Sequence, residues 1–282
     1  MNEERDQFAE LSEVRMCFRD EGNPAGEPLL LIMGLSSQLI HWPQEIVDQL
    51  GERYRVIRPD NRDSGLTEWK DAPRQYFLRA IARDTVELLD HLGIERAHVV
   101  GASMGGMVAQ LLAIENASRV LSLCSIMSTP HVSIGMADGE VLQELVKKLP
   151  EDRDAAIAQT AALYALIGSK THAEADRARR LDLATRAYDR ARHPEGSVRQ
   201  ISAALMAPNR TPGLRGVRVP ALVIHGGEDS LIGIAGGAAT HAAIAGSTYL
   251  PLPDMGHDLP HALVTQVGTA IHSNASRAAA VV

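Results

Sequence analysis

The sequence has few aromatic residues, no net positive charge and no long apolar run, and each of these absences limits what the protein can be. Phe, Trp and Tyr together make up 4% of the 282 residues, so aliphatic side chains and methionine must fill the core. The formal net charge is −7, which argues against a nucleic-acid partner and against docking on anionic membranes, because both need a basic face. The chain has no stretch of about eighteen apolar residues, so no membrane span is predicted.

Cysteine is also rare, since the chain has only Cys17 and Cys124, each in an apolar segment typical of a strand. This pattern favours two buried thiols in a reducing compartment over a disulfide or a catalytic thiol. The first residues are acidic and lack the apolar stretch of a signal peptide. We therefore predict a cytoplasmic protein.

The sequence does contain a regular alternation of strand and helix patterns. Short apolar runs predict strands at 14–19, 29–33, 54–57, 97–100 and 120–126, and helical periodicity predicts helices at 43–50, 76–92 and directly after Ser103. A second series of strand, helix, strand and helix is predicted at 219–225, 235–244, 248–252 and 259–271. Continuous apolar runs suit strands that are buried on both faces of a parallel sheet. The predicted fold class is therefore α/β, with a mostly parallel, doubly wound sheet.

The alternation is interrupted between residues 131 and 212, where the pattern is helical throughout. We predict a helical cap at 131–212, inserted into a core made of residues 1–130 and 213–282. Because the insert follows the strand after Ser103, we expect it to lie as a lid over an active site. We also expect the core sheet not to need the insert, and the alanine-rich tail from residue 273 to fray.

The strongest local signal is Gly101-Ala102-Ser103-Met104-Gly105, a G-x-S-x-G pattern between a predicted strand and a predicted helix. A serine at such a sharp turn needs small neighbours on both sides, which the two glycines supply. The following helix points its positive end at the serine and favours developing negative charge there. Ser103 is thus predicted to be a nucleophile and the backbone N–H of Met104 an oxyanion donor. The alternative is a chance Gly-Ser-Gly turn, which the flanking strand and helix disfavour.

A nucleophilic serine needs a base, and the base needs an acid that orients it. In a fold with this nucleophile turn the three follow in the order serine, acid, histidine. Asp229 follows a Gly-rich turn after a predicted strand, and His257 follows the last predicted strand, so we predict them as acid and base. Both lie at carboxyl ends of strands, where open α/β sheets place their sites. The disfavoured rivals are Glu228, Asp254 and Asp258 for the acid, and His225 and His261 for the base.

The second oxyanion donor is expected in the loop after the strand at 29–33. Gly34 lets the backbone turn there, and the N–H of Leu35 can face the site, with an ordinary strand-end glycine as the alternative. Apolar residues of the cap are candidates for contacting a lipophilic substrate, although packing of the cap on the core would explain them as well. The predicted substrate-binding residues are Gly34, Met127, Leu163, Tyr164, Ile167 and Met206.

Two further patterns carry no predicted chemistry. Asp60 and Arg62 are expected to brace the loops after the strand at 54–57, with Gly65 making a turn, although Arg62 could instead bind a substrate carboxylate. The eleven histidines form no metal-binding motif. Because a serine triad and water complete a hydrolysis, no metal or cofactor is predicted.

Several of these segments together resemble the α/β-hydrolase family and, within it, the branch that contains aclacinomycin methylesterase. The segments are Leu31-Ile32-Met33-Gly34, His41-Trp42-Pro43, Arg58-Pro59-Asp60-Asn61-Arg62-Asp63-Ser64-Gly65 and Pro253-Asp254-Met255-Gly256-His257, and the resemblance covers roughly residues 14 to 271. The resemblance implies the α/β-hydrolase fold and hydrolysis of a carboxylic ester, of which a methyl ester on a bulky polycyclic compound is one form. The substrate does not carry over, because the cap sets it and caps diverge.

The sequence therefore predicts a serine carboxylic ester hydrolase that acts on a lipophilic small molecule through an acyl-enzyme. On the same triad a carbon–carbon bond hydrolase, an acyltransferase and a cofactor-free perhydrolase or haloperoxidase stay open, and so does a ligand-binding receptor without turnover. Dehalogenases and epoxide hydrolases of this fold use Asp as nucleophile, whereas position 103 is Ser. No nucleic-acid or membrane partner is predicted, and the chain is expected to be a monomer or a homodimer.

Overall fold

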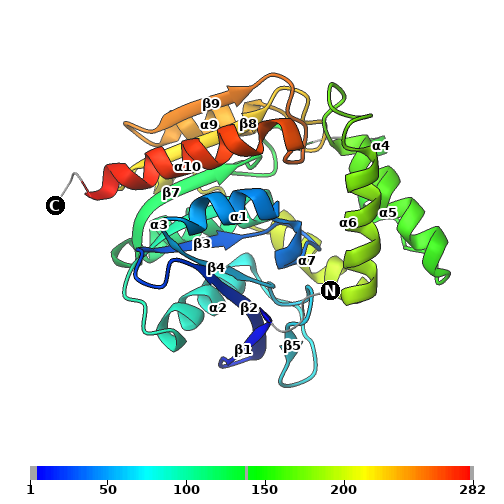
Figure 1. The fold of residues 1–282 in the computed structure, drawn as a ribbon, viewed down its shortest axis with the longest axis horizontal. Coiled ribbons are helices and arrows are strands. Elements are labelled where there is room, and N and C mark those ends of the chain that lie inside the picture. Colours follow the sequence, from blue (N-terminus) through cyan, green and yellow to red (C-terminus); the bar gives the residue numbers. More distant parts are fainter. Residues whose placement is uncertain (1–4, 137–138, 280–282) are drawn as a thin grey trace.

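The computed structural model describes residues 5–136 and 139–279, and its framework is one mixed sheet (Figure 1). The strands are β1 (Gln7–Glu10), β2 (Val14–Gly22), β3 (Pro28–Ile32), β4 (Arg55–Pro59), β5 (Glu68–Trp69), β6 (Ala97–Ala102), β7 (Val120–Ile126), β8 (Ala221–Gly226) and β9 (Thr248–Leu252). They are ordered β1-β2-β4-β3-β6-β7-β8-β9, and β5 pairs with β2. From β4 to β9 all neighbours are parallel, whereas β2 is antiparallel to β1, β4 and β5.

Helices connect the strands and cover both faces of the sheet. Those of the core are α1 (Gln44–Gly51), α2 (Leu78–His91), α3 (Met104–Glu115), α9 (Ala235–Ala243) and α10 (Val264–Ala279), with short 3-10 turns η2 (Leu39–His41), η3 (Ala117–Arg119) and η4 (His261–Leu263). Between β7 and β8 the chain forms α4 (Glu140–Val146), α5 (Arg153–Ile167), α6 (Arg177–Arg190), α7 (Pro194–Leu205) and α8 (Thr211–Leu214). A mostly parallel sheet with helices on both faces confirms the predicted α/β fold class.

The central strands are buried on both faces because their side chains alternate between two apolar clusters. Leu29 and Leu31 of β3 belong to the cluster under α1 and α10. Leu30 and Ile32 of the same strand belong to the cluster under α2 and α3. Burial on both faces explains why β3 appears in the sequence as a continuous apolar run rather than as an alternating one.

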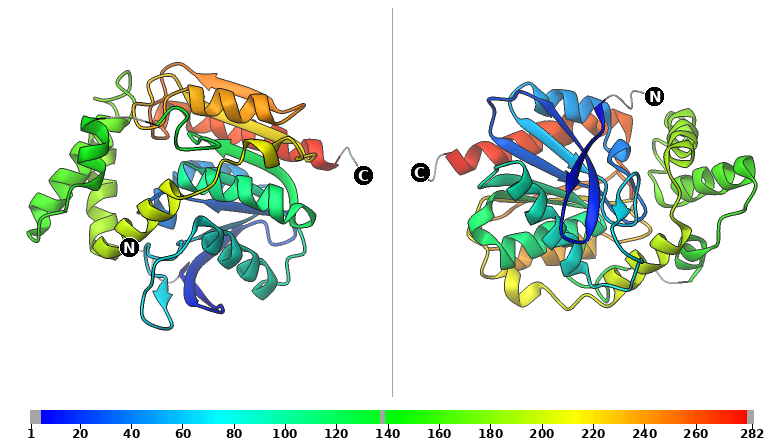
Figure 2. Two further views of the ribbon diagram at one scale, coloured as in Figure 1. Left: turned by 180° about the vertical axis from the view of Figure 1, so that it is seen from behind. Right: turned by 90° about the horizontal axis from the view of Figure 1, so that it is seen from below.

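The inserted segment (131–212) stands beside the sheet rather than on either of its faces. In Figures 1 and 2 its helices α4, α5 and α6 (green) lie outside the layers that α1, α10, α2 and α3 form on the sheet. Helix α7 then brings the chain back toward the core. Within the described ranges, no helix is both long and apolar enough to cross a bilayer.

The expectation that the chain frays from residue 273 is wrong for the part that the structure describes. Helix α10 continues to Ala279. Asn274 is 4% exposed and donates a 3.0 Å hydrogen bond from Nδ2 to the carbonyl oxygen of Leu123 in β7, and Ala275 is 1% exposed. Ala275 is thus packed in the protein interior, and alanine at this position does not indicate a solvated tail.

Asn274→Ala should lower the free energy of unfolding by about 1–2 kcal/mol, because it removes a buried hydrogen bond between the last helix and the sheet. The matched control is Ser273→Ala, which changes an exposed residue whose hydroxyl bonds only within the helix and should stay within about 0.5 kcal/mol of the parent. Urea denaturation measures both. Equal stability of the two variants would show that this part of α10 does not anchor to β7.

Candidate active site

Ser103 lies in a sharp turn between β6 and α3. Its backbone angles are φ 56° and ψ −121°, outside the regions that residues other than glycine favour. A Cβ on Gly101 would lie 2.1 Å from the carbonyl oxygen of Gly105, and a Cβ on Gly105 would lie 2.2 Å from the carbonyl oxygen of Ile32. Only glycine therefore allows strand, turn and helix to pack this closely. Helix α3 begins at Met104, so its N-terminus adjoins the serine.

The structure brings Ser103, His257 and Asp229 into one chain of contacts. Oγ of Ser103 is 2.8 Å from Nε2 of His257, and Nδ1 of His257 is 2.8 Å from Oδ2 of Asp229. The second carboxylate oxygen of Asp229 accepts hydrogen bonds from the backbone amides of Leu231 (3.0 Å) and Ile232 (2.8 Å). The Asp229 side chain is fully buried, so these two amides and the imidazole fix its orientation.

The loop after β3 passes directly beside the serine. A Cβ on Gly34 would lie 2.9 Å from Cβ and 3.4 Å from Oγ of Ser103. The hydrogen bonds of the described residues give the backbone amides of Leu35 and Met104 no protein acceptor. The amide of Met104 has none because the first N–H groups of a helix lack a partner within it. Both amides are thus available to an oxygen atom bound next to Ser103.

Backbone strain is concentrated at this edge of the sheet. Within the described ranges, the residues other than glycine with positive φ are Ser36 (55°), Asp63 (64°), Ser103 (56°) and Met127 (42°). They follow β3, β4, β6 and β7, which are neighbours in the sheet. Such conformations cost about 1–3 kcal/mol each and persist only where the surroundings over-determine them. Their clustering makes the carboxyl edge of these four strands the candidate functional edge.

Glu228, one of the rivals of Asp229, contacts the inserted segment. One of its carboxylate oxygens accepts the backbone N–H groups of Lys170 (2.7 Å) and Thr171 (3.0 Å), together with the hydroxyl of Ser169 (3.0 Å). The other oxygen accepts the hydroxyl of Thr171 at 2.6 Å. These hydrogen bonds, those from Thr171 first, lower the pKa of Glu228 to about 2. Glu228 thus holds the turn between α5 and α6, which we call the inserted turn (168–172).

The other two rival carboxylates contact the same segment. Oδ2 of Asp254 is 2.9 Å from Nε2 of His172. Asp258 accepts the backbone N–H of Ser169 at 3.0 Å and the guanidinium of Arg180 at 2.8 Å. All three acids that sequence reasoning weighed against Asp229 therefore bind the inserted segment, while Asp229 lies against the histidine.

The inserted turn also reaches the histidine loop itself. The backbone N–H of His257 donates to the carbonyl oxygen of Ile167 at 2.8 Å. A Cβ on Gly256 would lie 2.2 Å from the backbone nitrogen of Ser169, so the two backbones are in direct contact. The insert thus supplies the acceptor for the His257 amide, while the expectation that the core sheet does not need the insert stays a prediction. Sequence reasoning missed these contacts because no local motif marks them.

The two rival histidines lie elsewhere. His225 is fully buried at the end of β8, where Nε2 is 2.7 Å from the carbonyl oxygen of Ile232 and burial lowers its pKa. Its Nε2 lies 3.6 Å from Oδ2 of Asp229, which is farther than the 2.8 Å from Nδ1 of His257 to the same oxygen. His261 lies in η4 with a side chain that is 65% exposed, 3.3 Å from Glu45.

Some of the predicted substrate-binding residues lie beside Ser103 or His257, and others lie away from them. Gly34 adjoins Ser103, and Ile167 adjoins His257 through its carbonyl group while its side chain is 8% exposed. Met127 is 5% exposed and packs in the cluster under α1 and α10. Their roles toward a substrate stay predictions.

The remaining three candidates belong to the inserted segment. Leu163 is half-buried against the core, and the hydroxyl of Tyr164 lies 2.8 Å from Nε2 of His41, at the end of the loop that carries Leu35. Burial lowers the pKa of His41 to about 4. Met206 is 57% exposed after α7, and its sulfur accepts a hydrogen bond from Ser202. No described hydrogen bond joins Met206 to the triad.

The buried Arg62 braces the loops, as predicted. Its guanidinium is fully buried and makes two 2.6 Å hydrogen bonds to Asp84 and a third, at 3.0 Å, to Glu13. Cys17 and Cys124 are buried free thiols whose pKa values burial raises. Across residues 5–136 and 139–279, no group of three or more His, Cys, Asp or Glu side chains is arranged to hold a metal ion.

Comparisons with known proteins show the family of the chain. Residues 27–261 match the family model described as alpha/beta hydrolase fold. Rhodomycin D methylesterase DauP from Streptomyces sp. (strain C5) is 38% identical over 120 residues, which cover 39% of this chain and 40% of that protein. The dihydrolipoyllysine-residue acetyltransferase component of the acetoin cleaving system from Cupriavidus necator is 30% identical over 265 residues, which cover 89% of this chain and 64% of that protein.

A solved structure is also similar over nearly the whole chain. The enol-lactonase from Burkholderia xenovorans LB400 superposes with a TM-score of 0.81 at 25% identity, covering 96% of this chain and 100% of that one. The methylesterase match confirms the resemblance to the branch that contains aclacinomycin methylesterase, although the chain matches only 40% of that relative's length. Because the family model spans most of the sequence, the chain belongs to the alpha/beta hydrolase fold family.

Proposed function

We propose that this protein is a serine hydrolase that cleaves a carboxylic ester of a lipophilic small molecule through an acyl-enzyme on Ser103. The observation that carries the proposal is the unbroken chain of 2.8 Å contacts from Asp229 through His257 to Ser103. A hydroxyl group is a weak nucleophile, and an adjacent base that is itself oriented by a third group makes it an effective one. The proposed location is the cytoplasm.

In the first half of the proposed reaction, Oγ of Ser103 attacks the ester carbonyl carbon while Nε2 of His257 takes its proton. Asp229 accepts the Nδ1–H, which keeps the ring in the required tautomer and stabilises the imidazolium as it forms. The imidazolium then gives its proton to the departing alcohol. The acyl group stays on Ser103.

In the second half, His257 takes a proton from water while the water oxygen attacks the acyl carbon. The bond from that carbon to Oγ of Ser103 then breaks, the imidazolium returns its proton to Oγ, and the carboxylic acid leaves. In both halves the carbonyl oxygen becomes negatively charged. The amides of Leu35 and Met104 are the proposed donors to that oxygen, and the N-terminus of α3 adds a favourable dipole. Ser103, His257, Asp229 and water complete the cycle.

The substrate class rests on the relatives. One is named a methylesterase and another an enol-lactonase, and both names denote an ester as the substrate of those proteins. We therefore propose a carboxylic ester, with a methyl ester as the first to test. The half-buried Leu163 and Tyr164 make the inserted segment the proposed lid over an apolar substrate.

A second candidate is transfer of the acyl group to an acceptor other than water. It is favoured by the 30% identity over 89% of the chain to a protein named an acetyltransferase component. The two candidates share the acyl-enzyme and differ only in what attacks it. Adding alcohols and thiols during turnover distinguishes them, because an acyltransferase diverts most of the acyl group to the added acceptor.

Ser103→Ala should lower kcat/KM for ester hydrolysis by about 10⁴-fold or more, since the acyl-enzyme can no longer form. A fluorophosphonate should label the parent protein at Ser103, as located by peptide mass spectrometry, and should not label the variant. Ser133→Ala, an exposed serine of the inserted segment, serves as the control and should hydrolyse and label like the parent. Parent-like hydrolysis by a folded Ser103→Ala protein would refute the proposal.

Asp229→Asn keeps the shape of the side chain but leaves the imidazole without its orienting charge. We expect kcat to fall by about 10²–10⁴-fold, where the upper figure is the loss that the equivalent change causes in the serine-protease template. We do not expect a neighbouring carboxylate to take over the role of Asp229, because Asp254 and Asp258 are bonded to the inserted segment. Asp254→Asn is the matched control and should lose far less. A greater loss in Asp254→Asn than in Asp229→Asn would reassign the acid.

Glu228→Gln tests whether the inserted turn is held by charge. The folded-state pKa of Glu228, about 2, lies below its ordinary value of 4.5, so the carboxylate stabilises the fold above about pH 4.5 and loses this contribution as the pH falls toward 2. The difference in unfolding free energy between the parent and Glu228→Gln should be constant above about pH 4.5 and shrink below it.

Urea denaturation at successive pH values measures this difference. Glu174→Gln, which changes an 88% exposed carboxylate of the same segment, should show little difference from the parent at any pH. If the difference in unfolding free energy between the parent and Glu228→Gln were as large near pH 3 as at pH 7, the charge of Glu228 would not be what holds the inserted turn.

A further inference from the structure

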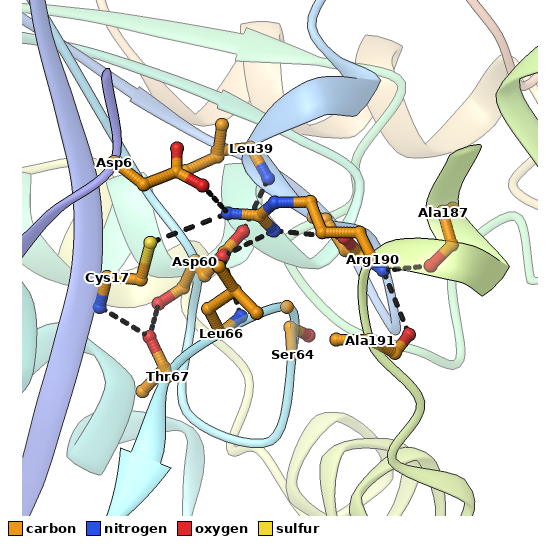
Figure 3. Close-up of polar contacts among 12 residues, drawn as sticks. Asp6, Cys17, Leu39, Asp60, Ser64, Leu66, Thr67, Ala187, Arg190 and Ala191 are labelled. Atoms are coloured by element: carbon orange, nitrogen blue, oxygen red, sulfur yellow. Dashed lines mark hydrogen bonds and ion pairs between the residues drawn. The ribbon is translucent and has the colours of Figure 1, made fainter. Parts of the chain in front are cut away.

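A buried arginine from the inserted segment, Arg190, reaches the core and points toward Asp60, Asp6 and Cys17 (Figure 3). Arg190 is the last residue of α6, and its side chain is 4% exposed. Its Nη1 donates to Asp60 at 2.7 Å and to Oε1 of Gln38 at 2.9 Å. Its Nη2 donates to Asp6 at 3.2 Å and to the sulfur of Cys17 at 3.4 Å. The guanidinium therefore bridges the inserted segment, the loop after β4 and the start of the chain.

Asp60 connects this guanidinium to the loop that carries Leu35, which we call the oxyanion loop (34–41). One carboxylate oxygen of Asp60 accepts the backbone N–H of Leu39 at 2.7 Å, and the other accepts that of Leu66 at 2.9 Å as well as Arg190. Asp60 is fully buried, and burial raises its pKa against the opposing charge of Arg190. A buried carboxylate needs such a cation, so Arg190 helps to keep Asp60 charged and bonded to the loop.

Gln38 of the oxyanion loop makes a second connection to α6. Its Nε2 donates to the carbonyl oxygens of Ala187 (2.7 Å) and Ala191 (3.1 Å), which lie at the end of that helix. The carbonyl oxygen of Ala187 also accepts the backbone N–H of Ala191, the residue that caps α6, so Gln38 bonds to the last turn of the helix and to its cap. The side chain of Gln38 is buried, so both connections lie away from solvent.

The next helix of the inserted segment holds the residue directly after Leu35. Oε1 of Gln200 in α7 accepts the backbone N–H of Ser36 at 2.7 Å, and Nε2 of Gln200 donates to the carbonyl oxygen of Arg62 at 2.7 Å. Gln200 is fully buried. Ser36 has a strained φ of 55°, which needs external contacts to persist. The inserted segment supplies one of those contacts through Gln200 and another through Ser197, whose hydroxyl lies 2.7 Å from that of Ser36.

We propose that Arg190 and Gln200 are positioning residues that hold the oxyanion loop so that the amide of Leu35 faces the carbonyl oxygen of a substrate at Ser103. This inference rests on the proposed function. Because both residues belong to the inserted segment, the oxyanion hole is complete only when that segment is seated on the core. Displacing the segment withdraws Arg190 from Asp60 and Gln200 from Ser36, while Ser103 and the amide of Met104 remain in the core.

The test compares Arg190→Met, Arg190→Lys and Gln200→Met with Arg186→Gln. Arg186 lies on the same helix, bonds to Asp182 and is 46% exposed, so it is the matched control. Losing one oxyanion donor costs about 10²–10³-fold in kcat, so a displaced donor should cost at least about tenfold. We expect that loss in kcat, with KM within about threefold of the parent, for Arg190→Met and Gln200→Met. Arg190→Lys should recover part of the loss, and Arg186→Gln should match the parent.

Hydrogen exchange of the oxyanion loop gives a readout that does not depend on activity. Each protein is measured at a temperature the same number of degrees below its own melting temperature. Peptides covering residues 34–41 should then exchange faster in Arg190→Met and Gln200→Met than in the parent. Peptides from β8 should exchange at the rate of the parent in both variants. Gln200→Met carries no charge change, so it remains informative if Arg190→Met does not fold.

The outcomes separate the two proposals. A parent protein that neither hydrolyses esters nor takes up a fluorophosphonate at Ser103 would refute the proposed function, and the exchange of residues 34–41 would still decide whether Arg190 and Gln200 hold the loop. An active parent whose Arg190 and Gln200 variants keep both kcat and the exchange of the loop would overturn the inference. Faster exchange throughout the core, with kcat and KM changed together, would assign these residues a general structural role and would overturn it as well.

Discussion

The serine turn between β6 and α3 exists only because backbone from three elements packs against it without intervening side chains. Gly101 and Gly105 let the strand and the helix approach each other, and Gly34 lets the loop after β3 lie within contact distance of Ser103. The strained angles of Ser103 then direct its hydroxyl toward His257, and the helix that starts at the next residue presents unpaired amides to the same space. The spacing of Ser103, His257 and the amides of Leu35 and Met104 therefore depends on this one close approach, and the strands behind it are buried among apolar side chains.

The inserted segment completes this edge through directional polar contacts as well as apolar packing. The last residue of α5 accepts the amide of His257, and the turn that follows it binds Glu228. Helices α6 and α7 reach the oxyanion loop through Arg190 and Gln200. Buried charges and amides tolerate little displacement, because each must keep its partner. These buried polar contacts therefore fix the position of the inserted segment on the core. A segment that only covered a pocket would not need such directional contacts. We infer that acid, base and oxyanion loops are aligned together when the segment is seated.

The sequence predicted best what local pattern determines. Apolar runs located the central strands, and the G-x-S-x-G turn with its chain order pointed to Ser103, Asp229 and His257, whose catalytic roles stay proposals. The short strands β1 and β5 were missed because their residues form no apolar run, and the end of α10 was missed because alanine fits both a packed helix and a loose tail. Contacts between distant segments could not be predicted, because no local sequence pattern accompanies them. Arg190 and Asp60 are 130 residues apart in the sequence, and Thr171 and Glu228 are 57 residues apart. The cytoplasmic location and the monomeric or dimeric state stay predictions.

The central claim is that Ser103 carries the acyl group during turnover. It is tested most directly by mixing the protein with an excess of an activated ester such as a p-nitrophenyl ester, quenching with acid within the first turnovers, and mapping the peptides by mass spectrometry. The account predicts an added acyl mass on the peptide that contains Ser103, assigned to that side chain by fragmentation, and its disappearance once the substrate is consumed. Turnover with no acyl mass on Ser103 at any time, or with the mass on another residue, would contradict it.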